Sequence, residues 1–194
     1  MSRDSLVGKA RESAELVTSF IASCAQALDH TARVMAERFG RGGRLYVMGN
    51  GGSACDAQHV AVEFTHPIVE KRRPLPALAL GSDVALVTAI GNDGDFAQVF
   101  AVQLQLVARD VDIVLGISTS GTSPNVIRGM RVAREAGALT VAFAGRDGGP
   151  LADLCEHAFV VPSWSIHRTQ EVHTVLLHLL WDQVHVALGE PDVL

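Results

Sequence analysis

Two groups of polar side chains have the spacing that metal binding or acid–base chemistry requires. His59 and Glu63 are four residues apart in a segment with helical periodicity, so both lie on one face of that helix. Such a pair can bind a common metal ion or a common substrate, although it is also typical of a solvated helix surface. Further candidates lie on the last expected helix: Gln170, Glu171, His173 and His178. Imidazole, carboxylate and amide groups together favour zinc.

The spacing on the last helix raises a geometric question. Gln170 and His178 are eight residues apart, which is about 12 Å along a helix axis. They can reach one ion only if both side chains lean inward past the small Thr174; otherwise the ligands come from different subunits. A carboxylate and a histidine beside a sugar phosphate suit aldose–ketose isomerisation, because a base and an acid must move protons through an enediol. A metal ion would polarise the carbonyl group.

Two loops carry the small residues that anion binding requires. The first, Gly49-Asn50-Gly51-Gly52-Ser53, precedes a helix whose N-terminus offers free N–H groups. The second, Ser118-Thr119-Ser120-Gly121-Thr122-Ser123, is rich in hydroxyls and precedes Pro124, with Ser123 as the expected N-cap. Each loop alone is also typical of an ordinary turn. Together, at the carboxyl ends of two strands, they favour a phosphate ligand. The chain lacks a Walker-type sequence and the Rossmann glycine spacing, which disfavours a nucleotide.

Short apolar runs alternate with helical stretches and predict the elements that position these loops. The runs, expected to be strands, are residues 45–48, 77–80, 112–117, 139–144 and 158–161. This alternation predicts an α/β fold with a five-stranded parallel sheet and helices on both faces. Helical spacing also predicts an N-terminal arm over residues 1–42, ended by glycines, and a last helix over 165–188. We therefore expect a single domain, 1–194, whose sheet-and-helix core spans 43–188.

Composition excludes several classes of protein. The chain has 194 residues and a net charge of −5, and its only basic cluster is Lys71-Arg72-Arg73, which argues against a nucleic-acid partner. It contains no apolar run of the ~20 residues that a membrane helix needs and no secretory signal at its start, so we expect a cytoplasmic protein without membrane contact. We expect reduced and mostly buried thiols at Cys24, Cys55 and Cys155.

These motifs together resemble the phosphoheptose isomerases of the SIS (sugar isomerase) superfamily. The resemblance is carried, in one order from about residue 43 to 188, by 49–53 with Asp56-Ala57-Gln58-His59, and by 91–93, 116–121, 145–149 and 168–173. It implies an SIS-type three-layer sandwich. It also implies the interconversion of sedoheptulose 7-phosphate and D-glycero-D-manno-heptose 7-phosphate.

The resemblance implies a role for each matching residue. Glu63 and His178 match the acid–base pair of the family, whose zinc ligands match His59, Glu63, Gln170 and His178. One Zn²⁺ ion per subunit and a homotetramer with active sites at subunit interfaces are implied as well. The implied substrate-binding residues are Asn50, Gly51, Gly52, Ser53, Asn92, Asp93, Ser118, Thr119, Ser120, Ser123 and Gln170.

Two departures and two other function classes qualify this expectation. His167 replaces a usual aspartate, and Thr65 is followed by His66-Pro67 where the family usually reads Thr-Gly-Arg. Both changes fall around the sugar, so a phosphosugar of another chain length or stereochemistry stays open.

One alternative is a non-enzymatic branch of the SIS superfamily that binds the bacterial replication initiator. Members of that branch lack the catalytic Glu and His, which this sequence keeps as Glu63 and His178. A transcription regulator would need a DNA-binding module, for which the first forty residues are too short and too poor in basic residues. We expect structural roles for His30, His157, His173 and His185.

Overall fold

A five-stranded parallel sheet forms the centre of the molecule in the computed structural model, which describes residues 3–68 and 72–193. The strand order is β2-β1-β3-β4-β5, and each neighbouring pair is parallel. The strands are β1 (Leu45–Gly49), β2 (Ala77–Ala79), β3 (Ile113–Ser118), β4 (Leu139–Gly145) and β5 (His157–Val161). All five coincide with the predicted apolar runs.

The three inner strands are buried along their whole length. Every residue of β1, β3 and β4 is buried, because helices cover both faces of the sheet. This is why these strands form continuous apolar runs in the sequence rather than an alternating pattern. The edge strands β2 and β5 are partly exposed.

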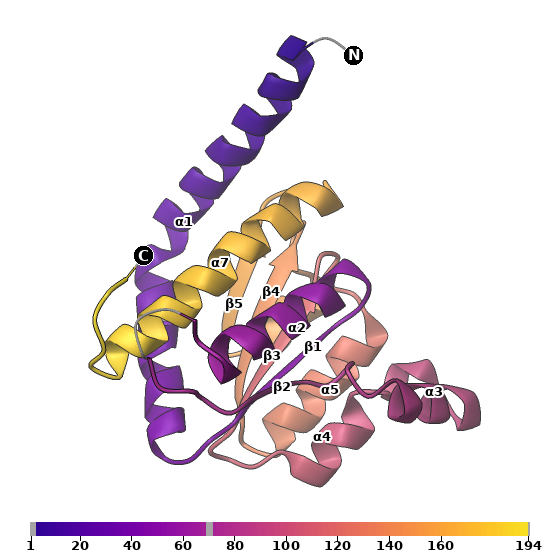
Figure 1. Ribbon diagram of the computed structural model, residues 1–194. Coiled ribbons are helices and arrows are strands. Elements are labelled where there is room, and N and C mark those ends of the chain that lie inside the picture. Colours follow the sequence, from indigo (N-terminus) through magenta and orange to yellow (C-terminus); the bar gives the residue numbers. More distant parts are fainter. Residues whose placement is uncertain (1–2, 69–71, 194) are drawn as a thin grey trace.

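Helices form the two outer layers (Figure 1). One apolar cluster joins α1, α2 and α7 to one face of the sheet, and a second joins α4, α5 and α6 to the other. This confirms the three-layer α/β architecture. The helices are α1 (Arg3–Gly40), α2 (Gly52–Thr65), α3 (Val84–Asp93), α4 (Ala101–Val107), α5 (Pro124–Glu135), α6 (Gly149–Leu154) and α7 (Ile166–Ala187), with a 3-10 helix η1 (Phe96–Gln98).

The expected N-terminal arm is one continuous helix of 38 residues, α1. It ends at Gly40, as the glycines after it predict; residues 1–2 of the arm lie outside the described residues. Its second half packs on α7 and the sheet through Leu28, Ala32 and Met35. Its first half extends beyond the sheet (Figure 1) and leaves Leu6 and Val7 exposed.

Helix α3 is apolar yet buries no residue. It lies at the edge of the molecule (Figure 1), where its main contacts are with η1. Val84 is 69% exposed and Leu86 is 38% exposed. An apolar helix in this position has a surface that the single chain does not cover.

The basic cluster noted in the sequence is part of the folded structure. Arg72 is buried, donates to Asp182 Oδ1 at 2.6 Å, and stacks over the Trp181 ring at 4.5 Å. Arg73 pairs with Glu190 at 3.1 Å, whereas Lys71 lies outside the described residues. The charges of Arg72 and Arg73 are therefore neutralised within the chain, so these two residues do not form a phosphate-binding patch.

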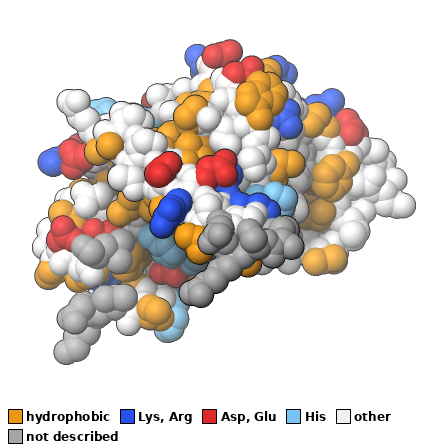
Figure 2. All heavy atoms as spheres, turned by 90° about the horizontal axis from the view of Figure 1, so that it is seen from above, with side chains coloured by type: hydrophobic (Ala, Val, Ile, Leu, Met, Phe, Trp, Pro, Cys, Tyr) orange, Lys and Arg blue, Asp and Glu red, His pale blue; other side chains and the backbone are white. Residues whose placement is uncertain are grey.

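Figure 2 shows basic and acidic side chains interspersed over the face that it presents, among the residues described there. In the part of the chain that the structure covers, none of the helices is both long enough and apolar enough to cross a bilayer.

Candidate active site

Three of the predicted ligands converge between α2 and α7. His59 and Glu63 project from α2, and His178 projects from α7, which packs beside it. The Nε2 atoms of His59 and His178 are 3.3 Å apart, and His59 Nε2 is 3.3 Å from Glu63 Oε1. One ligand atom from each of the three residues lies within 4.8 Å of the others.

This spacing fits a zinc ion. Zinc prefers a tetrahedral site with Zn–N distances of about 2.0–2.1 Å, which places neighbouring ligand atoms about 3.4 Å apart. The His59–His178 and His59–Glu63 separations of 3.3 Å match this distance between neighbouring ligand atoms. The two imidazole rings meet at 78° rather than stacking, so their nitrogen atoms can face a common point. Two imidazoles and a carboxylate form a donor set that suits zinc.

The surroundings of the triad affect the protonation of its members and neighbours. Burial lowers the pKa of His178, the nearby His59 lowers it further, and Glu63 opposes both effects. The neutral imidazole that results is the form that binds a metal. One turn before His59, burial raises the pKa of Asp56 to about 6, and its Oδ2 atom has no hydrogen-bond partner.

Gln170 lies apart from the triad, against the start of α2. A Cβ atom on Gly52 would be 2.1 Å from Gln170 Nε2, so the amide occupies the space that a side chain would take. Gly52 is seven residues before His59, about two helical turns. The two helices thus meet at Gly52–Gln170 and again at His59–His178. The structure brings three of the four predicted ligands together and places the fourth about two turns away.

The glycine loop, residues 49–53, joins β1 to α2 as expected. Gly51 has φ 55°, which favours glycine, and it precedes the first residue of α2. A Cβ atom on Gly49 would be 2.4 Å from the backbone oxygen of Ser53. Two of the glycines are therefore required by the backbone itself. Ser53 is buried within this turn.

The serine loop, residues 118–123, gathers its hydroxyls at the end of β3. Ser118 Oγ lies 2.9 Å from Ser123 Oγ and 3.4 Å from Ser120 Oγ, and Thr122 Oγ1 donates to Ser120 Oγ at 2.9 Å. Pro124 begins α5, as predicted. Ser123 does occupy the N-cap position, but its side chain makes no capping bond. The predicted N-cap position was confirmed, but the expected side-chain capping bond was wrong, because the Ser123 hydroxyl pairs with Ser118 instead.

A cavity of about 290 Å³ lies between the two loops and η1. Asn50 and Ser123, both predicted to bind substrate, line it. Sequence reasoning missed the other lining residues, which are Asp95, Phe96, Ala97, Pro124 and Asn125. Only for Asn125 did the sequence offer a signal of a place in the cavity, because Asn125 directly follows Pro124, the expected helix start after the serine loop.

Two predicted sugar contacts lie elsewhere on the chain. Asn92 and Asp93 are exposed at the end of α3, and Asn92 Nδ2 donates to Asp93 Oδ1 at 2.8 Å. Neither lines the cavity beside Asn50. Of the positions that depart from the usual motif, His66 is exposed at the end of α2 and His167 is exposed in the first turn of α7.

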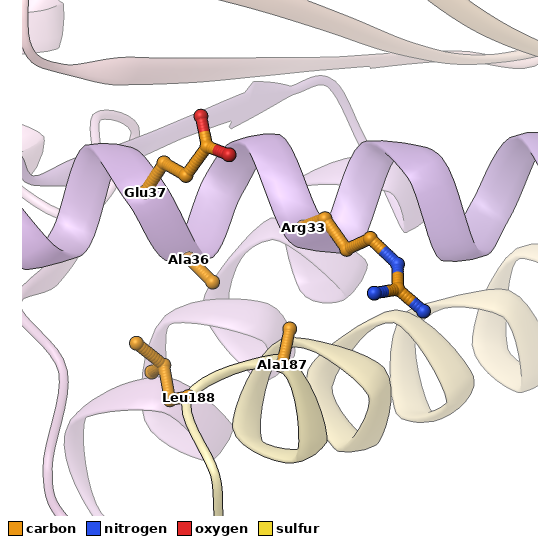
Figure 3. A pocket seen from close by; sticks show the side chains of 5 residues that line it. All are labelled: Arg33, Ala36, Glu37, Ala187 and Leu188. Atoms are coloured by element: carbon orange, nitrogen blue, oxygen red, sulfur yellow. The ribbon is translucent and has the colours of Figure 1, made fainter.

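A second cavity, of about 320 Å³, lies between α1 and the end of α7 and contains none of the candidate residues (Figure 3). Arg33, on its rim, pairs with Asp29 at 3.0 Å, and the other lining residues are Ala36, Glu37, Ala187 and Leu188. We assign no chemistry to this cavity.

The remaining histidines and the cysteines differ in burial. His173 and His185 are fully buried. His157 lies 3.1 Å from the hydroxyl of Thr31, and its ring is 5.4 Å from that of His30. Cys24, Cys55 and Cys155 are free, but Cys55 is exposed and the other two are half-buried, so the expectation of mostly buried thiols was wrong.

Comparison with known proteins identifies the family. The family model for the SIS domain matches residues 10–145. The phosphoheptose isomerase of Aquifex aeolicus is 43% identical over 180 residues, covering 93% of this chain and 94% of that protein. The phosphoheptose isomerase of Solidesulfovibrio magneticus is 48% identical over 169 residues, covering 87% of this chain and 82% of that protein.

Solved structures agree with the sequence relatives. Phosphoheptose isomerase GmhA from Neisseria gonorrhoeae superposes with a TM-score of 0.87 at 34% identity, covering 94% of this chain and 97% of that one. A phosphoheptose isomerase from Francisella tularensis superposes with a TM-score of 0.90 at 32% identity, covering 96% and 99%. The chain therefore belongs to the phosphoheptose isomerase family of SIS-domain proteins.

Proposed function

We propose that this enzyme, a sugar-phosphate isomerase by family, interconverts sedoheptulose 7-phosphate and D-glycero-D-manno-heptose 7-phosphate. The observation that carries the proposal is the convergence of His59, Glu63 and His178 between α2 and α7, with separations of 3.3 Å. The retained Glu63 and His178 favour an enzyme over a binding protein with an SIS fold. We also propose that it acts in the cytoplasm.

The acid–base roles follow from the chemistry of the two groups. The Glu63 carboxylate removes the proton on the carbon next to the carbonyl and returns it to the neighbouring carbon. His178 exchanges the proton between the two substrate oxygens, for which a neutral imidazole with a lowered pKa is well suited. Zinc, when held by His59, Glu63 and His178, would supply Lewis-acid polarisation of the carbonyl. Gln170 remains a proposed fourth ligand that would have to move from its place at Gly52.

The two loops divide the rest of the substrate between them. We assign the phosphate to the N-terminus of α5 and to the hydroxyls of the serine loop, which can donate hydrogen bonds to an anion without a lysine. The proposed phosphate ligands are Ser118, Thr119, Ser120 and Ser123. We assign the sugar to the cavity and to the glycine loop residues Asn50, Gly51, Gly52 and Ser53.

A homotetramer with shared active sites is part of the proposal. Helix α3 exposes Val84 and Leu86, and a second copy of the chain could bury them. The same contact could bring Asn92 and Asp93, at the end of α3, to a neighbouring site. This would explain why neither residue lines the cavity of its own chain.

Replacing Glu63 by glutamine tests the mechanism. Glu63→Gln keeps the size of the side chain but removes the base, so turnover of sedoheptulose 7-phosphate should fall by on the order of 10²–10⁴. Zinc content and circular dichroism should be recorded on the same sample. Glu37→Gln, on the exposed face of α1, is the matched control and should keep full activity.

Each alternative result has a definite meaning. Unchanged turnover in Glu63→Gln would refute the acid–base assignment. A zinc-loaded wild-type enzyme without turnover would point to another phosphosugar and give weight to His66 and His167. Neither turnover nor bound zinc would favour a binding protein.

A further inference from the structure

Asn125 is a buried amide that joins the two loops of the site. It is 2% exposed and is the second residue of α5, directly after the serine loop. Asn50 Nδ2 donates to Asn125 Oδ1 at 2.9 Å, and Asn125 Nδ2 donates to Asn50 Oδ1 at 2.8 Å. The two side chains thus form a reciprocal pair across 75 residues of sequence.

A backbone group sets the orientation of this pair. The N–H of Val126 donates to Asn125 Oδ1 at 3.0 Å. Because a backbone N–H can only donate, the oxygen of Asn125 must face it, and its nitrogen must then face Asn50 Oδ1. The pairing uses one of the two amide hydrogens of Asn50. The second hydrogen is left free to donate to a ligand in the cavity that Asn50 lines.

The sheet explains why the two loops can be joined here. β1 and β3 are neighbours, and their ends are level because Gly49 is paired with Ile117. The glycine and serine loops therefore leave the sheet side by side. The Asn50–Asn125 pair bridges them at the point where both face the cavity.

We propose that Asn125 is a positioning residue for the isomerase reaction, which acts through Asn50 and does not touch the substrate's reacting atoms. It holds the free amide hydrogen of Asn50 toward an oxygen of the sugar chain. It also fixes the position of the glycine loop, which binds the sugar, relative to the serine loop, which binds the phosphate. The inference rests on the proposed function, since it assigns the cavity to a sugar phosphate.

The expected effect follows from the loss of one oriented hydrogen bond. In Asn125→Ala the Asn50 amide is free to rotate, so the substrate loses a contact whose net value is about 1 kcal/mol. KM for sedoheptulose 7-phosphate should rise by roughly five- to tenfold. We expect kcat to stay within about twofold, because the contact is made equally in the ground and transition states. A purely structural defect would instead lower the fraction of active enzyme and reduce kcat at unchanged KM.

A double-mutant cycle tests whether Asn125 acts through Asn50. The four proteins are wild type, Asn50→Ala, Asn125→Ala and the double variant, each loaded with zinc. If the inference holds, Asn125→Ala adds no more than about a further twofold to KM in the Asn50→Ala background. Val126→Ala is the matched control, because it truncates the adjacent buried side chain without removing the amide pair. It should lose thermal stability but keep the wild-type KM.

Two results would overturn the proposal: a wild-type KM in Asn125→Ala, or single-variant effects that multiply in the double variant. Calorimetric titration of the same proteins with fructose 6-phosphate, ribose 5-phosphate and sedoheptulose 7-phosphate separates this inference from the proposed substrate. If wild type binds one of these sugars without turning over sedoheptulose 7-phosphate, the proposed reaction fails. The double-mutant cycle is then evaluated from the dissociation constants of the bound sugar phosphate, and the four proteins should show the same pattern as expected for KM. Failure of wild type to bind any of them would overturn both.

Discussion

Gly52 should not accept even a methyl group without a loss of activity. A Cβ atom there would be 2.1 Å from Gln170 Nε2 and 2.9 Å from Gln170 Cδ, and both distances are too short for non-bonded atoms. The amide would have to retreat by more than about 1 Å to reach ordinary contact distance. Gln170 is also an expected substrate-binding residue, and a displacement of about 1 Å in a group that positions the substrate costs on the order of 100-fold in rate, even away from the reacting atoms. We therefore expect Gly52→Ala to lower kcat/KM by roughly that factor.

Stability should respond differently to the same substitution. The obstructing atoms belong to the end of a flexible side chain, so Gln170 can move aside without disturbing the backbone. Gly52 is the first residue of α2 and has no positive φ, and alanine is favoured over glycine in helices by up to about 1 kcal/mol. The melting temperature of Gly52→Ala should therefore equal or exceed that of the wild type.

The assay combines kcat/KM, zinc content and thermal denaturation for four variants. Gly8→Ala is the matched control, because a Cβ on this helical glycine of α1 meets nothing within 4 Å. Gln170→Ala and the double variant show whether the effect passes through Gln170. Wild-type kcat/KM in Gly52→Ala would refute the reasoning, and so would an undiminished effect in the Gln170→Ala background.

Two predictions concern the stability of α7. Asp182→Ala removes the partner of the buried Arg72, whose guanidinium lies 2.6 Å away, and should lower the free energy of unfolding by about 3–5 kcal/mol in urea denaturation. Asp29→Ala breaks the exposed pair with Arg33 and should cost less than about 1 kcal/mol; equal losses would contradict the burial argument. Burial lowers the pKa of His173 to about 4 from its ordinary 6.5, so the unfolded chain takes up this proton first as the pH falls. The stabilisation is present above pH 6.5 and is lost as the pH falls toward 4, by up to about 3 kcal/mol. His173→Gln should flatten the stability–pH profile in this window, and an unchanged profile would contradict the assignment.

Local sequence features determined the elements and part of the site. The apolar runs specified the three inner strands, because a strand buried on both faces needs apolar residues throughout, and apolar runs also marked the partly exposed edge strands β2 and β5. The helical spacing of His59 and Glu63 placed both on one face of α2, since four residues make about one turn. The glycine and serine loops were recognisable because turns and helix starts have strong local preferences.

Only the tertiary structure decided which distant groups meet. His178 reaches His59 across 119 residues because α2 and α7 pack side by side on one face of the sheet. The same packing places Gln170 at Gly52 rather than at the triad. The hydroxyl of Ser123 turned to Ser118 instead of capping α5, and Asn125 found its partner in Asn50. Periodicity specifies which face of a helix or strand is apolar, whereas these pairings depend on strand order and helix packing, which arise from the burial of the whole core.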